Sequence, residues 1–176
     1  MTYDSWPNLA TMFFERMAEI GDGPFLSAKR DGEWRAVSGN DAAAQAASLA
    51  GALRAMGISP GDRVMLVSEN RPEWAIADLG IMAAGAITVP AYVTNRVNDH
   101  LHVMTDSGAK AVIVSTAALA EIVREAAQGA PDMETMILID GDSDDDALSW
   151  NDLLAAHPGA LDAVAGAAKE IKRSET

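Results

Sequence analysis

Residues 68–92 read SENRPEWAIADLGIMAAGAITVPAY, and the pattern of this stretch indicates the fold class of the chain. A short apolar run at 63–67 precedes it. Pro72 suits the first turn of a helix, where its missing N–H breaks no hydrogen bond. Gly85 is expected to end that helix, and a second short apolar run begins at Ile87. The stretch therefore predicts strand, helix and strand in succession, which is one unit of a parallel α/β fold.

The rest of the chain continues this alternation of short apolar runs with helical patterns. An alternating order of this kind predicts an α/β fold with a mostly parallel sheet flanked by helices. No linker divides the chain, so residues 1–176 are expected to form a single α/β subdomain. Strands are predicted at 25–29, 33–37, 63–67, 87–89, 111–114 and 135–139, and helices at 9–20, 41–56, 72–84, 98–105, 117–128 and 150–156.

An early β-hairpin is predicted around Asp31 and Gly32, which separate two strand-like runs. Asp-Gly favours a two-residue hairpin turn because both central positions must tolerate a positive φ. The hairpin is a candidate antiparallel edge for the main sheet.

Composition narrows the classes of partner. The formal net charge is −13, and an acidic surface repels phosphate backbones, so no nucleic-acid partner is expected. The chain contains no cysteine, which excludes disulfides, thiolate zinc sites and a cysteine nucleophile and fits a cytoplasmic protein. Its apolar runs fall short of the ~20 residues that a membrane span needs, so none is predicted.

One glycine pattern has the spacing of a phosphate-binding loop, from Gly80 to Gly85. Such a loop needs Lys and then Ser or Thr directly after it, to reach the phosphates and magnesium. Ala86 and Ile87 occupy those positions. We therefore interpret Gly85 as a position of close helix–strand packing, where a side chain would not fit.

The acidic run at 140–146 invites a calcium interpretation. An EF-hand loop needs Gly at its sixth position and Glu at its twelfth. Asp145 and Asn151 stand there instead, so a solvated acidic loop is favoured.

The three histidines give no catalytic or metal-binding pattern. His100 and His102 are two residues apart on a predicted helix, so their side chains should diverge. His157 is isolated in the sequence. No Ser/His/Asp triad has support.

Charged residues gather at the predicted strand-to-helix turn: Glu69, Arg71, Glu73 and, farther along, Asp78. A carboxylate in the first turn complements the helix dipole, which explains Glu73 without catalysis. Arg71 is a candidate anion ligand or an ion-pair partner of Glu69 or Glu73.

Two aromatic residues near this turn, Trp74 and Tyr92, are candidate pocket-lining residues. An aromatic at the start of an amphipathic helix more often belongs to the core, which is the favoured interpretation of Trp74.

Three segments carry a resemblance to a known family: MGISPGDRV at 56–64, SENRPEW with AAGAITVP at 68–90, and DSGAKAVIV at 106–114. In this order and spacing, the chain resembles the adenylate-forming acyl-CoA synthetases, a family that also holds luciferases and the adenylation domains of peptide synthetases. The resemblance covers about residues 9–140. SENRPEW and AYVTN at 91–95 are most similar to the long-chain fatty acid branch.

The resemblance implies a parent ligase with a two-step reaction. A carboxylate first reacts with ATP to give an acyl-adenylate and pyrophosphate, and the CoA thiol then displaces AMP from the acyl-adenylate. In the family a Gly/Ser/Thr-rich loop ending in Lys holds the phosphates, and later motifs bind adenine, ribose and magnesium. No position of this chain matches those motifs, so no catalytic, cofactor-binding or metal residue is predicted. The segment IKRSET at 171–176 is similar to the approach to the strand before that loop.

These resemblances give one main hypothesis and three rivals. In the main hypothesis the chain is an N-terminal scaffold fragment that is truncated before the phosphate-binding loop. The fragment is expected to be inactive and to bind no cofactor, whereas the parent enzyme is expected to use ATP, Mg and CoA. Its expected partners are the remainder of the ligase and other copies of itself, through exposed apolar surface. The rivals are a non-enzymatic interaction domain, a fragment of an amino-acid-activating adenylation domain, and a doubly wound ligand-binding domain.

Overall fold

The computed structural model describes residues 6–144, 146–158 and 161–172. It is an α/β structure with a five-stranded sheet in the order β4-β3-β5-β6-β7 and a separate two-stranded sheet, β1-β2. Every pairing in the five-stranded sheet is parallel, as predicted. Its strands are β3 Arg63–Val67, β4 Ile87–Ala91, β5 Ala109–Thr116, β6 Thr135–Asp140 and β7 Leu148–Ser149.

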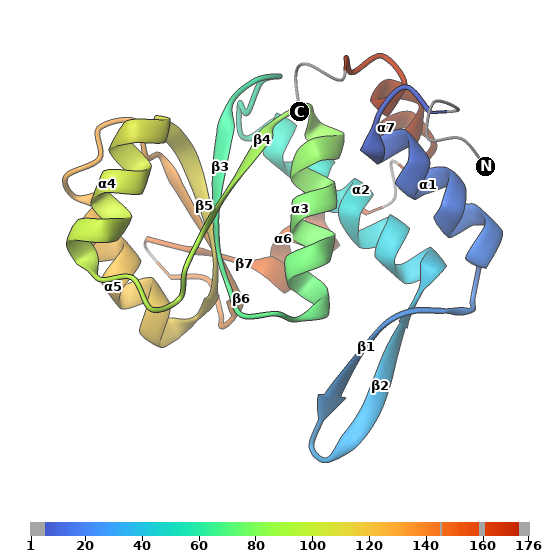
Figure 1. Cartoon of the computed structure of the whole chain (residues 1–176), viewed down its shortest axis with the longest axis horizontal. Coiled ribbons are helices and arrows are strands. Elements are labelled where there is room, and N and C mark those ends of the chain that lie inside the picture. Colours follow the sequence, from blue (N-terminus) through green and yellow to red (C-terminus); the bar gives the residue numbers. More distant parts are fainter. Residues whose placement is uncertain (1–5, 145, 159–160, 173–176) are drawn as a thin grey trace.

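Helices cover both faces of this sheet (Figure 1). α4 and α5 lie on one face, and α2, α3 and α6 lie on the other, with α1 and α7 outside them. The helices are α1 Leu9–Ile20, α2 Gly39–Ala55, α3 Pro72–Ala84, α4 Val97–Ser107, α5 Ala117–Ala127, α6 Trp150–Ala156 and α7 Leu161–Ala168.

Successive side chains of the central strands supply two separate cores. In β3, Val64 and Leu66 belong to the core under α2 and α3, whereas Met65 and Val67 belong to the core under α4 and α5. The sequence of a strand that is buried on both faces is a continuous apolar run and does not alternate between apolar and polar residues. This is why the apolar run at 63–67 predicted a strand.

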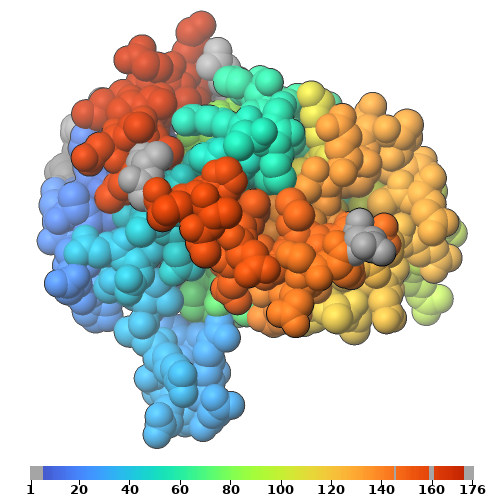
Figure 2. Space-filling model, turned by 180° about the vertical axis from the view of Figure 1, so that it is seen from behind, coloured from blue at the N-terminus to red at the C-terminus, as the bar shows by residue number. Residues whose placement is uncertain are grey.

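The early hairpin is β1 Pro24–Arg30 with β2 Glu33–Ser38, and its turn is as predicted, with φ of 53° at Asp31 and 85° at Gly32. The prediction that it forms an edge of the main sheet is wrong. It pairs only with itself and projects from the body of the molecule (Figure 2). β1 follows α1 in the chain and β2 precedes α2, so the packing of these two helices fixes the position at which the hairpin begins.

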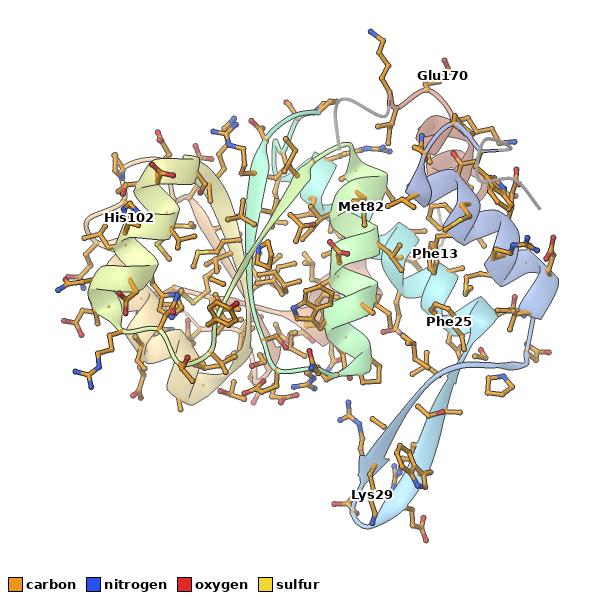
Figure 3. All side chains as sticks on the ribbon, viewed as in Figure 1. Phe13, Phe25, Lys29, Met82, His102 and Glu170 are labelled. Atoms are coloured by element: carbon orange, nitrogen blue, oxygen red, sulfur yellow. The ribbon has the colours of Figure 1, made fainter. Side chains whose placement is uncertain are left out.

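The base of the hairpin is fastened to the helical layer by aromatic contact. Phe25 of β1 lies 6.0 Å from Phe13 of α1, measured between ring centroids (Figure 3). Beyond this base the hairpin is exposed, and Trp34 of β2 keeps 74% of its surface in contact with solvent.

The glycine pattern in α3 serves packing and chain direction. A Cβ at Gly80 would lie 2.8 Å from Leu49 Cδ2 and 3.1 Å from the Ala46 carbonyl oxygen, so this glycine lets α2 and α3 approach closely. Gly85 ends α3 with a φ of 87°, and a Cβ there would crowd Pro60 at 3.3 Å. The neighbour of Gly85 is therefore the turn before β3 and not a strand, and the positive φ is what favours glycine at this position.

Candidate functional site

The carboxyl ends of parallel strands meet at one edge of a sheet, which is where ligand sites of α/β proteins lie. We call this the carboxyl edge. Here it carries the turn after β3, the loop after β4 and the last residues of β5 and β6. Two hollows open along it: a hairpin-side hollow of about 730 Å³, bounded by β1, and a β4-side hollow of about 500 Å³. Glu69 and Asn70 line both.

Four charged side chains tie the hairpin to this edge. Arg71 donates two hydrogen bonds to the Asp140 carboxylate, at 2.6 and 2.8 Å, and a third from Nε to Glu73 at 2.8 Å. Arg30 of β1 pairs with the other oxygen of Glu73. We call Arg30, Glu73, Arg71 and Asp140 the edge network. Its two cations and two anions balance, so it fixes geometry without adding net charge.

The edge network shifts the pKa values of Asp140, Glu73 and Arg71. Hydrogen bonds from Arg71 lower the pKa of the Asp140 carboxyl, although burial opposes the shift. At Glu73 burial raises the pKa, but the hydrogen bond and charge of Arg71 and the charge of Arg30 outweigh it, so the pKa is lowered. Hydrogen bonding to Asp140 raises the pKa of Arg71. All these groups are therefore held in their charged forms at neutral pH.

Glu69 has a different partner from the one its sequence position suggested. The buried hydroxyl of Ser115, near the end of β5, donates a 2.5 Å hydrogen bond to Glu69 Oε2. The predicted ion pair of Arg71 with Glu69 or Glu73 is confirmed, and Glu73 is the residue that forms it. Asp78 lies more than one turn farther along α3, outside the edge network.

The β4-side hollow contains both predicted aromatic residues. Trp74 is half-buried against the core, and it also lines the hollow together with Tyr92, which is 81% exposed. The pocket-lining alternative is thus confirmed for both residues.

Sequence reasoning missed Arg30, Ser115 and Asp140 as parts of this edge. A signal existed for Ser115 and Asp140, because each directly follows a predicted strand and so had to lie at the carboxyl edge of the sheet. No comparable signal marked Arg30, whose approach depends on the direction in which the hairpin leaves the helices.

The acidic loop is organised by its own backbone and an arginine. Asp144 accepts hydrogen bonds from the N–H groups of Asp146 and Ala147, at 2.8 and 2.7 Å, and pairs with Arg124 at 3.0 Å. Asp145, which the calcium argument used, lies outside the described residues. Within residues 6–144, 146–158 and 161–172, no group of three or more His, Cys, Asp or Glu could hold a metal ion.

The two histidines of α4 diverge, as predicted. His100 is fully buried, whereas His102 is exposed on the outer side of the helix (Figure 3). Neither ring nitrogen of His100 has a hydrogen-bond partner within the described part of the chain. Burial lowers the pKa of His100, and the nearby Asp99 charge opposes this only in part. His157 follows α6 as its C-cap.

The glycine pattern at residues 80–85 does not form a phosphate-binding loop. Gly80 is buried within α3 and Gly85 caps it, so the glycine pattern is no exposed loop.

No helix in the described ranges is long and apolar enough to cross a bilayer.

Comparison with known proteins identifies the family. The profile of the AMP-binding enzyme family matches residues 13–172. The chain belongs to this family. Among curated AMP-binding relatives, it is 35% identical over 134 residues to the long-chain-fatty-acid–CoA ligase FadD15 of Mycobacterium tuberculosis, covering 76% of this chain and 22% of FadD15. It is 33% identical over 165 residues to 4-coumarate–CoA ligase 3 of Oryza sativa subsp. japonica, covering 91% of this chain and 28% of the relative.

Solved structures agree with this AMP-binding fold. The anthranilate CoA ligase AuaEII superposes with a TM-score of 0.78 at 21% identity, covering 90% of this chain and 30% of that one. A benzoate CoA ligase from Burkholderia xenovorans LB400 superposes with a TM-score of 0.70 at 27% identity, covering 87% and 29%. The chain thus spans about a quarter of the length of the curated relatives named above.

Proposed function

We propose that this chain is the N-terminal scaffold portion of an ATP-dependent acyl-CoA ligase and is inactive by itself. The observation that carries the proposal is the family match over residues 13–172 in a chain that covers only 22% of FadD15. The proposed partner is the remainder of the ligase, and the proposed compartment is the cytoplasm.

The reaction belongs to the proposed parent. A carboxylate oxygen attacks the α-phosphorus of ATP and pyrophosphate leaves; the CoA thiol then attacks the acyl carbonyl and AMP leaves. Magnesium and donors around the phosphates would offset the charge that develops there. No group of three or more His, Cys, Asp or Glu among the described residues could hold the magnesium ion, and we assign no step of the reaction to this chain. Its role would be to hold the sheet and the carboxyl edge in place.

A fatty acid is the proposed substrate class of the parent. The likeness to FadD15, a long-chain-fatty-acid–CoA ligase by name, supports it, as does the SENRPEW segment at 68–74. The rival of an amino-acid-activating fragment predicts carrier-protein and condensation domains encoded alongside this chain. The rival of a non-enzymatic interaction domain predicts a natural stop codon after Thr176.

A chimera tests the scaffold role. The matching N-terminal region of FadD15 is replaced with this chain, and acyl-CoA formation from palmitate, ATP and CoA is followed by mass spectrometry. We expect activity in the chimera, and none in FadD15 that lacks the region. A chimera that folds, as judged by circular dichroism and a cooperative melt, yet forms no acyl-CoA would contradict the proposal.

A further inference from the structure

We propose that the β4-side hollow binds a small organic ammonium ion, with its cationic nitrogen on Glu69 and an apolar body against Trp74 and Tyr92. The proposal concerns this hollow alone and does not depend on the ligase function. The hollow's volume of about 500 Å³ is within the usual range for small-molecule sites.

The charge in the hollow selects a cation. Of the described residues that line it, Glu69 alone is charged; the others are polar, apolar or aromatic. The whole chain has a net charge of −13, which raises the local concentration of cations further. Arg71 lines the other hollow, and its guanidinium is occupied by Asp140 and Glu73.

The Glu69 carboxylate is held in place before any ligand arrives. Ser115 is fully buried, and its hydroxyl donates to Oε2 over 2.5 Å, a length typical of charge-assisted bonds. The other oxygen, Oε1, has no hydrogen-bond partner among the described residues. A fixed carboxylate with one oxygen available loses less conformational freedom on binding than a mobile surface glutamate.

The aromatic residues supply the second element of recognition. Tyr92 is 81% exposed at the end of β4, and Trp74 is half-buried in the first turn of α3. Faces of such rings attract ammonium groups through their quadrupoles, and tryptophan and tyrosine are the strongest of the side chains that do so. Pro90, Ala91 and Val93 add apolar surface for the ligand's body.

An anion is disfavoured, although the start of α3 is close by. Helix N-termini attract anions through free N–H groups. Pro72 has no N–H, the Glu73 carboxylate lies in the same turn and repels an anion, and the N–H of Trp74 donates to the Arg71 carbonyl at 3.0 Å. The first turn of α3 therefore offers few free N–H donors to an anion.

The experiment compares choline with 3,3-dimethyl-1-butanol, which has the same shape without the charge. Binding to the full 176-residue chain is measured by NMR chemical-shift titration and tryptophan fluorescence. We expect saturable choline binding in the millimolar range and at least about tenfold weaker binding of the alcohol. Glu69→Gln should weaken choline binding at least about tenfold. Glu121→Gln, the same charge change at an exposed position of α5, should leave it unchanged.

A second variant guards against misfolding. Tyr92→Ala removes an exposed ring, so it should keep the melting temperature of the parent while weakening choline binding severalfold. The proposal is overturned if neither compound binds, if both bind equally, or if the Glu69 and Tyr92 variants both bind choline as the parent does. None of these results bears on the ligase proposal, because no activity is measured.

Discussion

At the scale of single residues, the imidazole of His100 is a buried titratable group in α4. It is fully buried and lacks a hydrogen-bond partner within the described residues, and burial lowers its pKa. The unfolded chain, with an ordinary histidine pKa of about 6.5, therefore binds a proton more readily than the folded one. The contribution of neutral His100 to stability is complete above that pH and is lost as pH falls below it.

We predict that His100→Leu removes this loss. Between pH 6.5 and 5.5 the parent should lose unfolding free energy that the variant retains, by at most about 1 kcal/mol. Urea unfolding at pH 7.5, 6.5 and 5.5 measures the difference. His102→Leu, at an exposed position of the same helix, is the matched control variant. Equal pH slopes in the parent and His100→Leu would contradict the prediction.

Gly80 gives a second test at this scale. Gly80→Ala would bring a methyl group to 3.1 Å from the Ala46 carbonyl, so we expect a loss of about 1–3 kcal/mol as α2 and α3 are forced apart. Gly51→Ala in α2 meets no atom within 4 Å and should stabilise by about 0.5–1 kcal/mol. Denaturant melts of both variants distinguish close packing from helix propensity, which would favour alanine at both positions.

At the scale of elements, the hairpin is held at two points, by Phe13 and Phe25 at its base and by Arg30 in the edge network. Its turn could be predicted because Asp-Gly meets a local φ requirement. Its place could not, because the hairpin's direction depends on how α1 and α2 pack. β7, which is two residues long, is too short for any periodicity to mark it.

The edge network predicts how the hairpin responds to a charge change. Glu73→Gln removes the anion that joins Arg30 to Arg71, and because the Arg30 side chain is 45% exposed we expect a loss of about 0.2–1 kcal/mol in the local stability of the hairpin. Amide hydrogen exchange should quicken in β1 and β2 while β3 and β5 keep their protection. Glu33→Gln changes the same charge within the hairpin but outside the network, and its exchange should match the parent. Unchanged exchange in Glu73→Gln would show that the network does not hold the hairpin.

The candidate site shows the limit of sequence reasoning at this scale. The turn after β3 was marked by its own residues, including Glu69 and Trp74. Ser115 is 46 positions from Glu69, and only the parallel order of β3 and β5 brings the two together. Local patterns predict the strands, but the neighbours across the edge depend on strand order.

At the scale of the whole molecule, exposed aromatic surface accompanies a high negative charge. Trp34 and Tyr92 are 74% and 81% exposed, both at hollows of the carboxyl edge. We predict weak self-association through this surface, which sedimentation velocity detects as a rise in sedimentation coefficient with concentration. Trp34→Ser with Tyr92→Ser should reduce it. A parent that stays monomeric at tens of micromolar in ~0.15 M salt, where charge repulsion is screened, would contradict the prediction.

We propose that this chain is a scaffold within the AMP-binding family and does not carry the chemistry of a ligase. The most direct measurement incubates the purified 176-residue chain with palmitate, ATP, magnesium and CoA and follows both pyrophosphate and palmitoyl-CoA. We predict that neither product rises above the level without protein, while an intact FadD15 control forms both. Formation of either product by the chain alone would contradict the claim.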